Sequence, residues 1–476
     1  MNTPYPRDMK GYGRAIPDPK WPGGANVAVQ FVLNYEEGGE NNILHGDAAS
    51  EAFLSEIVGA QAWVGQRHWN MESIYEYGAR AGFWRLWRMF TERNVPLTIY
   101  GVATALMRSP EQVQAMQQAG WEIASHGLKW VEHKDMPEDE ERRQIAEAIR
   151  LHMQVTGERP LGWYTGRCSM NTTKLVMEEG GFLYSSDDYA DDLPYFLKKP
   201  DGAKHLIIPY TLDANDMRFA TPQGFNSGDQ FYTYLKDSFD VLYAEGAAGS
   251  PRMMSVGIHC RLAGRPGRAA ALTRFLDYVR GHDHVWVATR LDIARHWVKH
   301  HAPAGLKPSA MHRALFLEHF GDLFEHTPQI AERTHRAGLD ARHDDVPGLH
   351  KALVATMMSL PRDEKLALIR AHPELAGRLA LEGTLTADST SEQGRLGFTS
   401  MSREEFDKVA GINRRYREKH GFPVIVALAL HQTRDTAIAE MERRIGSTTD
   451  AEIEASLEQI GHISRNRLKQ RMAAFE

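Results

Sequence analysis

The sequence has little of what marks secreted, membrane-spanning or nucleic-acid-binding proteins. Its 476 residues include two cysteines, Cys168 and Cys260, too few for a disulfide framework, which favours a reducing compartment. No apolar run approaches the roughly 20 residues that cross a membrane, and no basic segment followed by an apolar one opens the chain. The net charge is −6, with lysines and arginines spread throughout, which argues against nucleic acid. We expect a cytoplasmic protein with no membrane or nucleic-acid partner.

The pattern of apolar runs changes near residue 300, which predicts two domains of different class. Before that point, short apolar runs alternate with helical patterns such as Ala81–Phe90, Pro110–Gln118 and Glu138–Met153, as in a parallel sheet built from βαβ units. Because most runs are apolar throughout, we expect strands buried on both faces, as in a barrel. The expected strands are Val27–Leu33, Pro96–Val102, Trp121–Ser125, Leu161–Tyr164, Phe182–Ser185, His205–Pro209, Met253–Ile258 and His284–Ala288.

A polar stretch with Pro303, Gly305 and Pro308 then predicts a linker. Beyond it, apolar residues recur at helical spacing and no convincing strand pattern appears. We therefore predict an α/β plus all-α protein: a distorted β/α barrel over residues 1–300, a linker over 301–311 and an all-helical bundle over 312–476. The expected helices include Leu353–Leu360, Asp363–Ala371, Glu374–Leu381, Arg403–Glu418 and Glu452–Met472, with capping boxes at Ser389, Ser402 and Thr449.

The predicted barrel has polar side chains where its strands end. In parallel barrels, catalytic groups gather at the carboxyl ends of the strands. Hydrolysis of a carbonyl compound needs a base to activate water, an acid for a leaving nitrogen and donors for the oxyanion. The side chains at these ends supply all three kinds of group, and they are Glu36, Glu37, His126, Arg167, Asp187, Asp188 and His259.

Four segments resemble motifs of the polysaccharide deacetylase (NodB-like) domains: Leu33-Asn-Tyr-Glu-Glu-Gly38, Ser125-His126-Gly, Trp163-Tyr-Thr-Gly-Arg167 and Ile258-His259. The resemblance implies a distorted β/α barrel. The usual pattern has two aspartates, one the base and the other a metal ligand, and two metal-binding histidines four residues apart. Here the aspartates are replaced by Glu36 and Glu37, and Trp130 takes the place of the second histidine. A catalytic zinc site normally needs three protein ligands, so we expect no tightly bound metal and no cofactor.

These departures, together with the segment Arg67–Gly78, resemble the cofactor-independent allantoinases, which open the hydantoin ring of allantoin to allantoate. By that resemblance Glu36 is the general base and His259 assists as acid, with His126 in the catalytic set. The residues expected to bind substrate are Glu37, Glu72, Arg167 and Asp187. The residues alone leave the base open among Glu36, Glu37, Asp187 and Asp188.

The helical region contains a second set of polar motifs. In order, these are His372-Pro373-Glu-Leu, Ser389-x-x-Glu392-Gln393, Asn413-x-x-Tyr416 followed by Gly421-Phe-Pro423, and Arg467-Leu468. They resemble the decarboxylases of 2-oxo-4-hydroxy-4-carboxy-5-ureidoimidazoline (OHCU), which form allantoin. The resemblance implies that His372 is the acid/base and that Glu392 orients it. Arg467 is expected to clamp the substrate carboxylate, and the residues expected to hold the ring and ureido groups are Pro373, Ser389, Gln393 and Val424.

The two resemblances imply consecutive steps of urate breakdown in one chain, with OHCU and allantoin as small-molecule substrates. We expect a homo-oligomer. Three alternatives stay open from the sequence. The barrel could be a metal-dependent carbohydrate N-deacetylase, or a platform without catalysis. The helical domain could serve only in oligomerisation.

Overall fold

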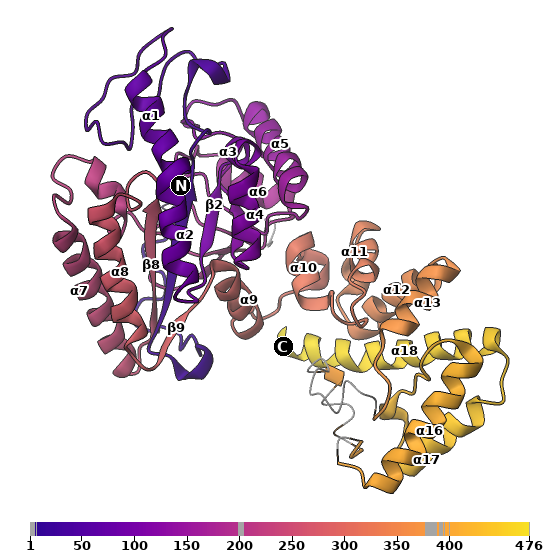
Figure 1. Ribbon diagram of the computed structural model, residues 1–476. Coiled ribbons are helices and arrows are strands. Elements are labelled where there is room, and N and C mark those ends of the chain that lie inside the picture. Colours follow the sequence, from indigo (N-terminus) through magenta and orange to yellow (C-terminus); the bar gives the residue numbers. More distant parts are fainter. Residues whose placement is uncertain are drawn as a thin grey trace. The chain divides into compact units, whose positions relative to one another are not determined.

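The computed structural model describes residues 5, 7–198, 204–376, 388–389, 394, 396–398 and 400–475. The chain divides into two compact units, Met1–His301 and Ala302–Glu476, which differ in class (Figure 1). The first is a curled, largely parallel sheet covered by helices, and the second is helical, which confirms the predicted fold class. No helix within the described ranges is long and apolar enough to cross a membrane.

The sheet of the first unit is parallel except at one end. Over the described residues its strand order is β6-β7-β5-β4-β3-β2-β1-β8, with β9 paired to β1, and β6 and β7 are antiparallel. All eight expected strands form, and β6 is an edge strand that the apolar pattern did not predict. The strands are β1 (Val27–Tyr35), β2 (Thr98–Gly101), β3 (Glu122–Ser125), β4 (Gly162–Trp163), β5 (Tyr184–Ser185), β6 (Tyr195–Lys198), β7 (Lys204–Ile207), β8 (Arg252–His259) and β9 (Val285–Val287).

Strand β1 pairs with three strands, β2, β8 and β9, and all nine of its residues are buried. Its β-branched and aromatic side chains suit a strand covered on both faces. The register sets Asn34 beside His259 of β8 and Tyr35 beside Gly101 of β2, which in turn pairs with Ser125 of β3. The residues that follow these strands therefore share one edge of the sheet.

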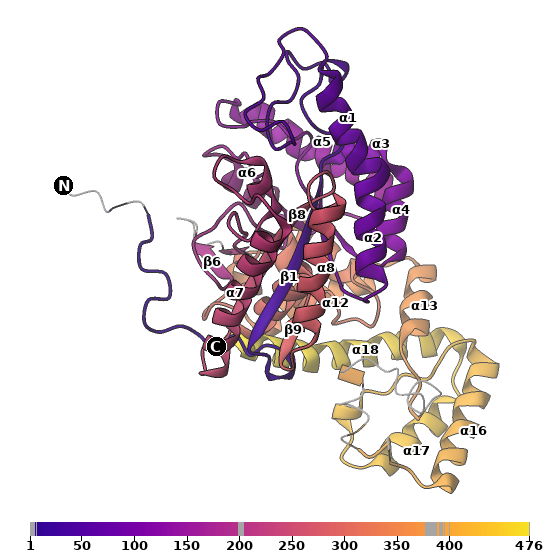
Figure 2. The same ribbon diagram turned by 60° about the vertical axis from the view of Figure 1, so that its left-hand side comes forward.

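Helices surround the sheet, and α7 packs on both α8 and β8 (Figure 2). The predicted helix at Pro110–Gln118 forms with those bounds. A five-residue π-helical turn, Gly78–Gly82, joins α1 to α2. A side chain at Gly78 would overlap the Glu37 carboxylate, and one at Gly82 would overlap the Cys260 carbonyl. The helices are α1 (Trp69–Tyr77), α2 (Phe83–Thr91), α3 (Ala103–Arg108), α4 (Pro110–Gln118), α5 (Glu138–Thr156), α6 (Thr172–Glu179), α7 (Gly228–Ala247), α8 (Pro266–Arg280) and α9 (Arg290–His300).

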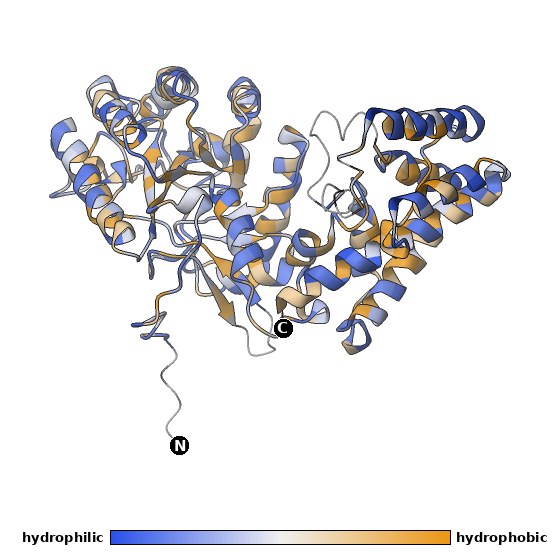
Figure 3. Cartoon of the chain, turned by 90° about the horizontal axis from the view of Figure 1, so that it is seen from below, coloured by the Kyte–Doolittle hydropathy of each residue, from blue (hydrophilic) through white to orange (hydrophobic). Residues whose placement is uncertain are grey.

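The second unit is built around its last helix, α18, which packs against α10, α12, α13 and α16. Figure 3 shows helices with mixed hydrophilic and hydrophobic surfaces in this unit, as amphipathic bundle helices have. The described helices are α10 (Arg313–Phe320), α11 (Gln329–Arg336), α12 (Val346–Met358), α13 (Arg362–Ala371), α16 (Arg403–His420), α17 (Arg434–Arg444) and α18 (Thr449–Met472).

Of the three predicted capping boxes, one forms, one does not, and one lies largely outside the described residues. The capping box at Ser402 is present, with Glu405 returning the hydrogen bond. The box at Thr449 is wrong, because Thr448 caps α18 and the Glu452 carboxylate instead accepts hydrogen bonds from Arg444 and Tyr416. The box at Ser389 extends to Glu392, and the expected helix Glu374–Leu381 extends past residue 376, so both lie largely outside the described residues. The described part of that helix, residues 374–376, is not helical.

Two candidate active sites

The shared edge of the barrel sheet brings three predicted residues together. Glu36 follows β1, His126 follows β3 and His259 ends β8. One carboxylate oxygen of Glu36, Oε1, lies 3.3 Å from His126 Nε2 and 3.5 Å from His259 Nε2. All three side chains are buried. A carboxylate and two imidazoles therefore meet where the topology predicts a catalytic centre.

Two further charged residues complete this cluster, and sequence reasoning missed both. Arg261 Nη2 donates to Glu36 Oε2 at 2.6 Å, and the Arg261 backbone N–H donates to Glu37 Oε1 at 3.2 Å. Asp216 Oδ1 lies 2.6 Å from His259 Nδ1, and its Oδ2 accepts the His259 backbone N–H at 2.8 Å. Arg261 lies two residues beyond β8, which a search past the strand end would have reached. Asp216 begins a 3-10 turn nine residues after β7 and has no comparable signal.

The charges of the cluster follow from these contacts. Burial opposes a charge on His259, but the carboxylates of Asp216 and Glu36 outweigh it and raise the pKa of His259 to about 9. Burial would raise the pKa of Glu36, yet Arg261 and His259 hold it well below its usual range. Burial and the neighbouring Glu36 raise the pKa of Glu37, against the influence of Arg261. At neutral pH the site thus pairs an ionised Glu36 with a protonated His259.

The carboxylates considered as alternative bases differ from Glu36. The Asp187 carboxylate accepts the backbone N–H groups of Thr165 and Gly166 at 2.7–3.0 Å, which ties it to the loop after β4. Burial raises the pKa of Asp187 despite these hydrogen bonds. Asp188 Oδ1 accepts the backbone N–H of Ala190. Neither makes a described hydrogen bond to the imidazoles at the strand ends.

The predicted substrate-binding residues Arg167 and Glu72 already have protein partners. The Arg167 guanidinium lies 3.9 Å from the centre of the Trp130 ring, and its Nη2 is 3.4 Å from Glu51 Oε1. Glu72 accepts hydrogen bonds from Arg67 at 2.7–3.3 Å and from Asn42 at 3.2 Å. Arg167 therefore stacks on Trp130 and pairs with Glu51, and no hydrogen bond among the described residues joins Glu72 to Glu36.

The donor set at the barrel edge does not fit a catalytic zinc ion. An indole stands at Trp130, where the metal-binding pattern has an imidazole, and an arginine contacts both adjacent glutamates. Across the described ranges, no group of three or more His, Cys, Asp or Glu side chains could hold a metal.

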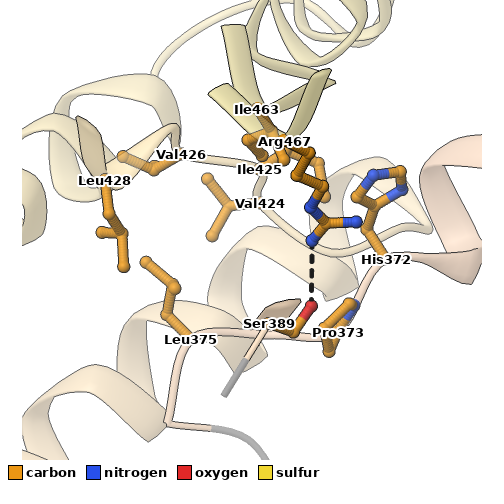
Figure 4. A pocket seen from close by; sticks show the side chains of 10 residues that line it. All are labelled: His372, Pro373, Leu375, Ser389, Val424, Ile425, Val426, Leu428, Ile463 and Arg467. Atoms are coloured by element: carbon orange, nitrogen blue, oxygen red, sulfur yellow. Dashed lines mark hydrogen bonds between the residues drawn. The ribbon is translucent and has the colours of Figure 1, made fainter. Parts of the chain in front are cut away.

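In the second unit, a pocket brings together five of the other predicted residues, which are His372, Pro373, Ser389, Val424 and Arg467 (Figure 4). It lies between the segment that follows α13, the segment that follows α16, and α18. In Figure 4, His372 and Arg467 come from different elements and both border this space. The lining residues are His372, Pro373, Leu375, Ser389, Val424, Ile425, Val426, Leu428, Ile463 and Arg467. Glu392 and Gln393 lie outside the described residues, so their roles stay predictions.

His372 has a defined tautomer in this pocket. Its Nδ1 is 2.9 Å from the Leu368 carbonyl, so Nδ1 carries the hydrogen and Nε2 keeps its lone pair. Nε2 is buried and has no hydrogen-bond partner among the described residues. Burial lowers the pKa of His372 to about 4. The imidazole is therefore a neutral proton acceptor at the pocket wall.

Arg467 is held by a carboxylate that sequence reasoning missed. Its Nη1 lies 2.6 Å from Glu325 Oε2, and its Nη2 donates to Ser389 Oγ at 3.2 Å. Ser389 Oγ donates to the other Glu325 oxygen at 2.9 Å. Glu325 follows the apolar run Leu323-Phe324 after α10, where a single acidic residue gives no sign of its partner. The guanidinium expected to clamp a substrate is thus already oriented by an ion pair.

The remaining motif residues belong to hydrogen-bond networks that hold the backbone of the pocket-lining residues. Asn413 Nδ2 donates to the carbonyl of Leu375, which lines the pocket, at 2.9 Å. Tyr416 Oη donates to Glu452 at 2.5 Å, and Arg444 joins Glu452 to the carbonyl of the pocket residue Ile425. These side chains fix the backbone that carries the site.

Comparison with known proteins matches each unit to one family. The polysaccharide deacetylase model matches residues 71–182. A polysaccharide deacetylase-like protein of Schizosaccharomyces pombe is 40% identical over 313 residues, covering 62% of this chain and 98% of that protein. The crystal structure of the Puue allantoinase is 59% identical with a TM-score of 0.62, covering 63% of this chain and 99% of that one.

The second unit matches a different family. The OHCU decarboxylase model matches residues 309–469. The 2-oxo-4-hydroxy-4-carboxy-5-ureidoimidazoline decarboxylase of Haloferax volcanii is 31% identical over 159 residues, covering 33% of this chain and 90% of that protein. The enzyme of the same name from Mus musculus is 32% identical over 169 residues, covering 36% of this chain and 93% of that protein.

Proposed function

Because the chain belongs to the polysaccharide deacetylase family in its first unit and to the OHCU decarboxylase family in its second, we propose that it is a bifunctional enzyme of urate breakdown. The second unit decarboxylates OHCU to (S)-allantoin, and the first hydrolyses the hydantoin ring of allantoin to allantoate. The observation that carries the barrel assignment is the Glu36–His259 pair in a site whose donors do not suit zinc. The identity of 59% to the Puue allantoinase supports it.

In the barrel, ring opening uses the opposite charges of Glu36 and His259. Glu36 accepts a proton from water as the oxygen bonds to the ring carbonyl carbon. The imidazolium of His259 donates its Nε2 proton to the ring nitrogen as the carbon–nitrogen bond breaks. The proton on Glu36 then returns to His259, 3.5 Å away. Because the proton moves within one pair, the net charge of the buried site is the same before and after turnover.

Asp216 supports this exchange by holding Nδ1 of His259, which fixes the ring so that Nε2 faces Glu36. We assign Arg167, Asp187, Glu37 and Glu72 to binding the ureido and ring amide groups. His126 Nε2, 3.3 Å from Glu36, positions the carboxylate from the other side.

In the helical unit, loss of CO2 needs a place for the electron pair and a proton delivered to one face. The bond to CO2 breaks and its electrons form a C=C bond to the neighbouring ring carbon. The electrons of the ring C=N bond move onto the nitrogen, which takes up a proton from water. The resulting enol regains its carbonyl as a proton reaches the neighbouring carbon. Neutral His372 accepts the hydroxyl proton and returns a proton to that carbon, which gives a single enantiomer. Arg467 binds the substrate carboxylate, and Glu392 and Gln393 complete the site.

We also propose that the chain consists of a barrel domain (residues 1–300), a linker (301–311) and a helical domain (312–476), and that each domain acts on its own substrate. We propose that the protein forms a homo-oligomer. The tether keeps allantoin production and consumption in one molecule, which raises local concentration.

The test follows both reactions on the full chain after metal has been stripped with a chelator. With racemic allantoin, allantoate forms, and polarimetry follows any residual enantiomer. With OHCU generated in solution, His372→Ala loses decarboxylation and keeps ring opening, whereas Glu36→Gln does the reverse, so each variant controls for the folding of the other. Turnover that appears only after zinc is restored would establish the metal-dependent deacetylase alternative. No ring opening under either condition would leave the barrel as a platform.

A further inference from the structure

Arg261 is one of the most deeply buried charges of the first unit, with no exposed surface. Its guanidinium contacts two adjacent carboxylates: Nη2 lies 2.6 Å from Glu36 Oε2, and Nη1 lies 3.5 Å from Glu37 Oε1. Its Nε donates to the Leu54 carbonyl at 2.8 Å. A buried arginine is costly unless such partners surround it.

Aromatic rings enclose the same guanidinium. Its Cζ lies 4.3 Å from the centre of the Tyr75 ring and 5.2 Å from that of Trp130. Trp130 stands where the metal-binding pattern has a histidine, and Glu37 stands where it has a carboxylate ligand. Two of the three positions that bind the metal in that pattern therefore lie against this arginine, and the third, His126, lies beside Glu36.

We propose that Arg261 is the fixed cation of this site and a positioning residue for ring opening: it keeps Glu36 ionised and in place, as a bound metal ion would otherwise do. The inference deepens the proposed function of the barrel and rests on it for its kinetic tests. The backbone supports the role, because Gly78 and Gly82 let the π-helical turn approach Glu37 and Cys260 closely.

The charge balance of the cluster needs this cation. Glu36 is ionised and two more carboxyl groups, Glu37 and Asp216, lie in the same cluster, whereas His259 gives up its charge during turnover. Arg261 is then the positive charge that remains at every stage. The titratable groups facing Glu36 and Arg261 are Glu37, Glu40, Tyr75, His126, Asp216, His259 and Cys260.

The first test separates charge from shape. Arg261→Ala loses allantoin hydrolysis, and millimolar guanidinium restores part of it, whereas urea, which has a similar planar shape without the charge, does not. Glu36→Gln serves as the matched control and gains nothing from guanidinium. Equal rescue by urea and guanidinium would overturn the proposal, because the arginine would then only fill space.

The second test uses the pH profile. In Arg261→Met the acid limb of kcat/KM moves upward by roughly 1–3 pH units, because a carboxylate loses its adjacent cation. Arg261→Lys moves less. An acid limb in Arg261→Met at the wild-type pH would contradict the role, whatever the loss in rate.

A third measurement does not depend on turnover, so it stands even if allantoin is not the substrate. Removal of Arg261 leaves Glu36 buried and ionised at high pH and protonated at low pH. Arg261→Met is therefore destabilised relative to wild type more at pH 8 than at pH 5, and Arg261→Met/Glu36→Gln recovers stability at pH 8. A double variant no more stable than the single one would refute the pairing on which the inference rests.

Discussion

Breaking the buried ion pair next to the pocket of His372 and Arg467 should destabilise the helical unit alone. The side chains of Arg444 and Glu452 are each 2% exposed, and Arg444 Nη2 lies 2.8 Å from Glu452 Oε2. Arg444 also donates to the carbonyl of the pocket residue Ile425. Glu452→Gln keeps the side-chain shape and still accepts the Tyr416 hydroxyl, but it leaves the guanidinium without its counter-charge.

Removal of one partner from a buried pair costs about 3–5 kcal/mol. Because the amide retains the Tyr416 hydrogen bond, we expect a loss near the lower end, about 3 kcal/mol, which is more than a hundredfold in the unfolding equilibrium of that unit. Decarboxylation should fall as well, since Arg444, which donates to the Ile425 carbonyl, loses the carboxylate that holds it in place.

The distribution of tryptophan makes the effect separable. All ten tryptophans lie between Trp21 and Trp297, in the first unit. In urea titrations, tryptophan fluorescence therefore follows the barrel, while far-UV circular dichroism follows both units. Glu452→Gln should move a helical transition to lower urea and leave the fluorescence transition unchanged.

A surface pair on α17, the helix that carries Arg444, gives the matched control. Arg443 and Glu440 form a largely exposed i,i+3 pair there, and such pairs contribute little. Glu440→Gln should leave both transitions where the wild type has them. If Glu452→Gln and Glu440→Gln behaved alike, the buried pair would not support the unit and the reasoning would fail.

Three further predictions concern the two sites. Glu36→Gln should lower allantoin hydrolysis by roughly 10²–10⁴-fold and leave decarboxylation intact; an active variant would move the base to another carboxylate. The raised pKa of His259, about 9, gives the barrel stability that is full below the unfolded value and lost as pH rises through about 9. Fluorescence-detected melting should show that decline in wild type and a smaller one in Asp216→Asn, where only Glu36 still raises the pKa of His259. The lowered pKa of His372, about 4, predicts that kcat/KM for decarboxylation holds from neutral pH down to about 5; a half-loss near pH 6.5 would mean that the imidazole is not buried in the working enzyme.

The barrel site was predictable where topology alone decides it. Parallel strands end at one edge, so Glu36, His126 and His259 could be placed together from their positions after apolar runs. Arg261 and Asp216 could not, because their partners depend on turns beyond the strands. The bridge from Asn215 to Gly257 of β8 is what brings Asp216 to His259.

The helical unit shows the same limit. His372, Ser389 and Arg467 come from distant motifs and line one pocket, as the resemblance implies. Glu325, which holds two of them, lies in a loop after α10 with no local pattern. The capping box expected at Thr449 failed because Thr448 caps α18, one residue earlier, and Glu452 instead binds the buried Arg444 and Tyr416. Local sequence rules cannot weigh such a tertiary partner.

The π-helical turn at Gly78–Gly82 has a consequence for how this barrel tolerates change. Gly78 and Gly82 have ordinary helical backbone angles, so conformational freedom does not explain them. The space above each is taken by Glu37 and by the Cys260 backbone. In a saturation library screened for allantoin hydrolysis, substitution of either glycine should therefore abolish activity, even when the new residue is alanine. Neither glycine has a side chain that could take part in the chemistry. The substitutions that the turn accepts would therefore measure how closely it packs against Glu37 and Cys260, although the turn itself supplies no group to the proposed reaction.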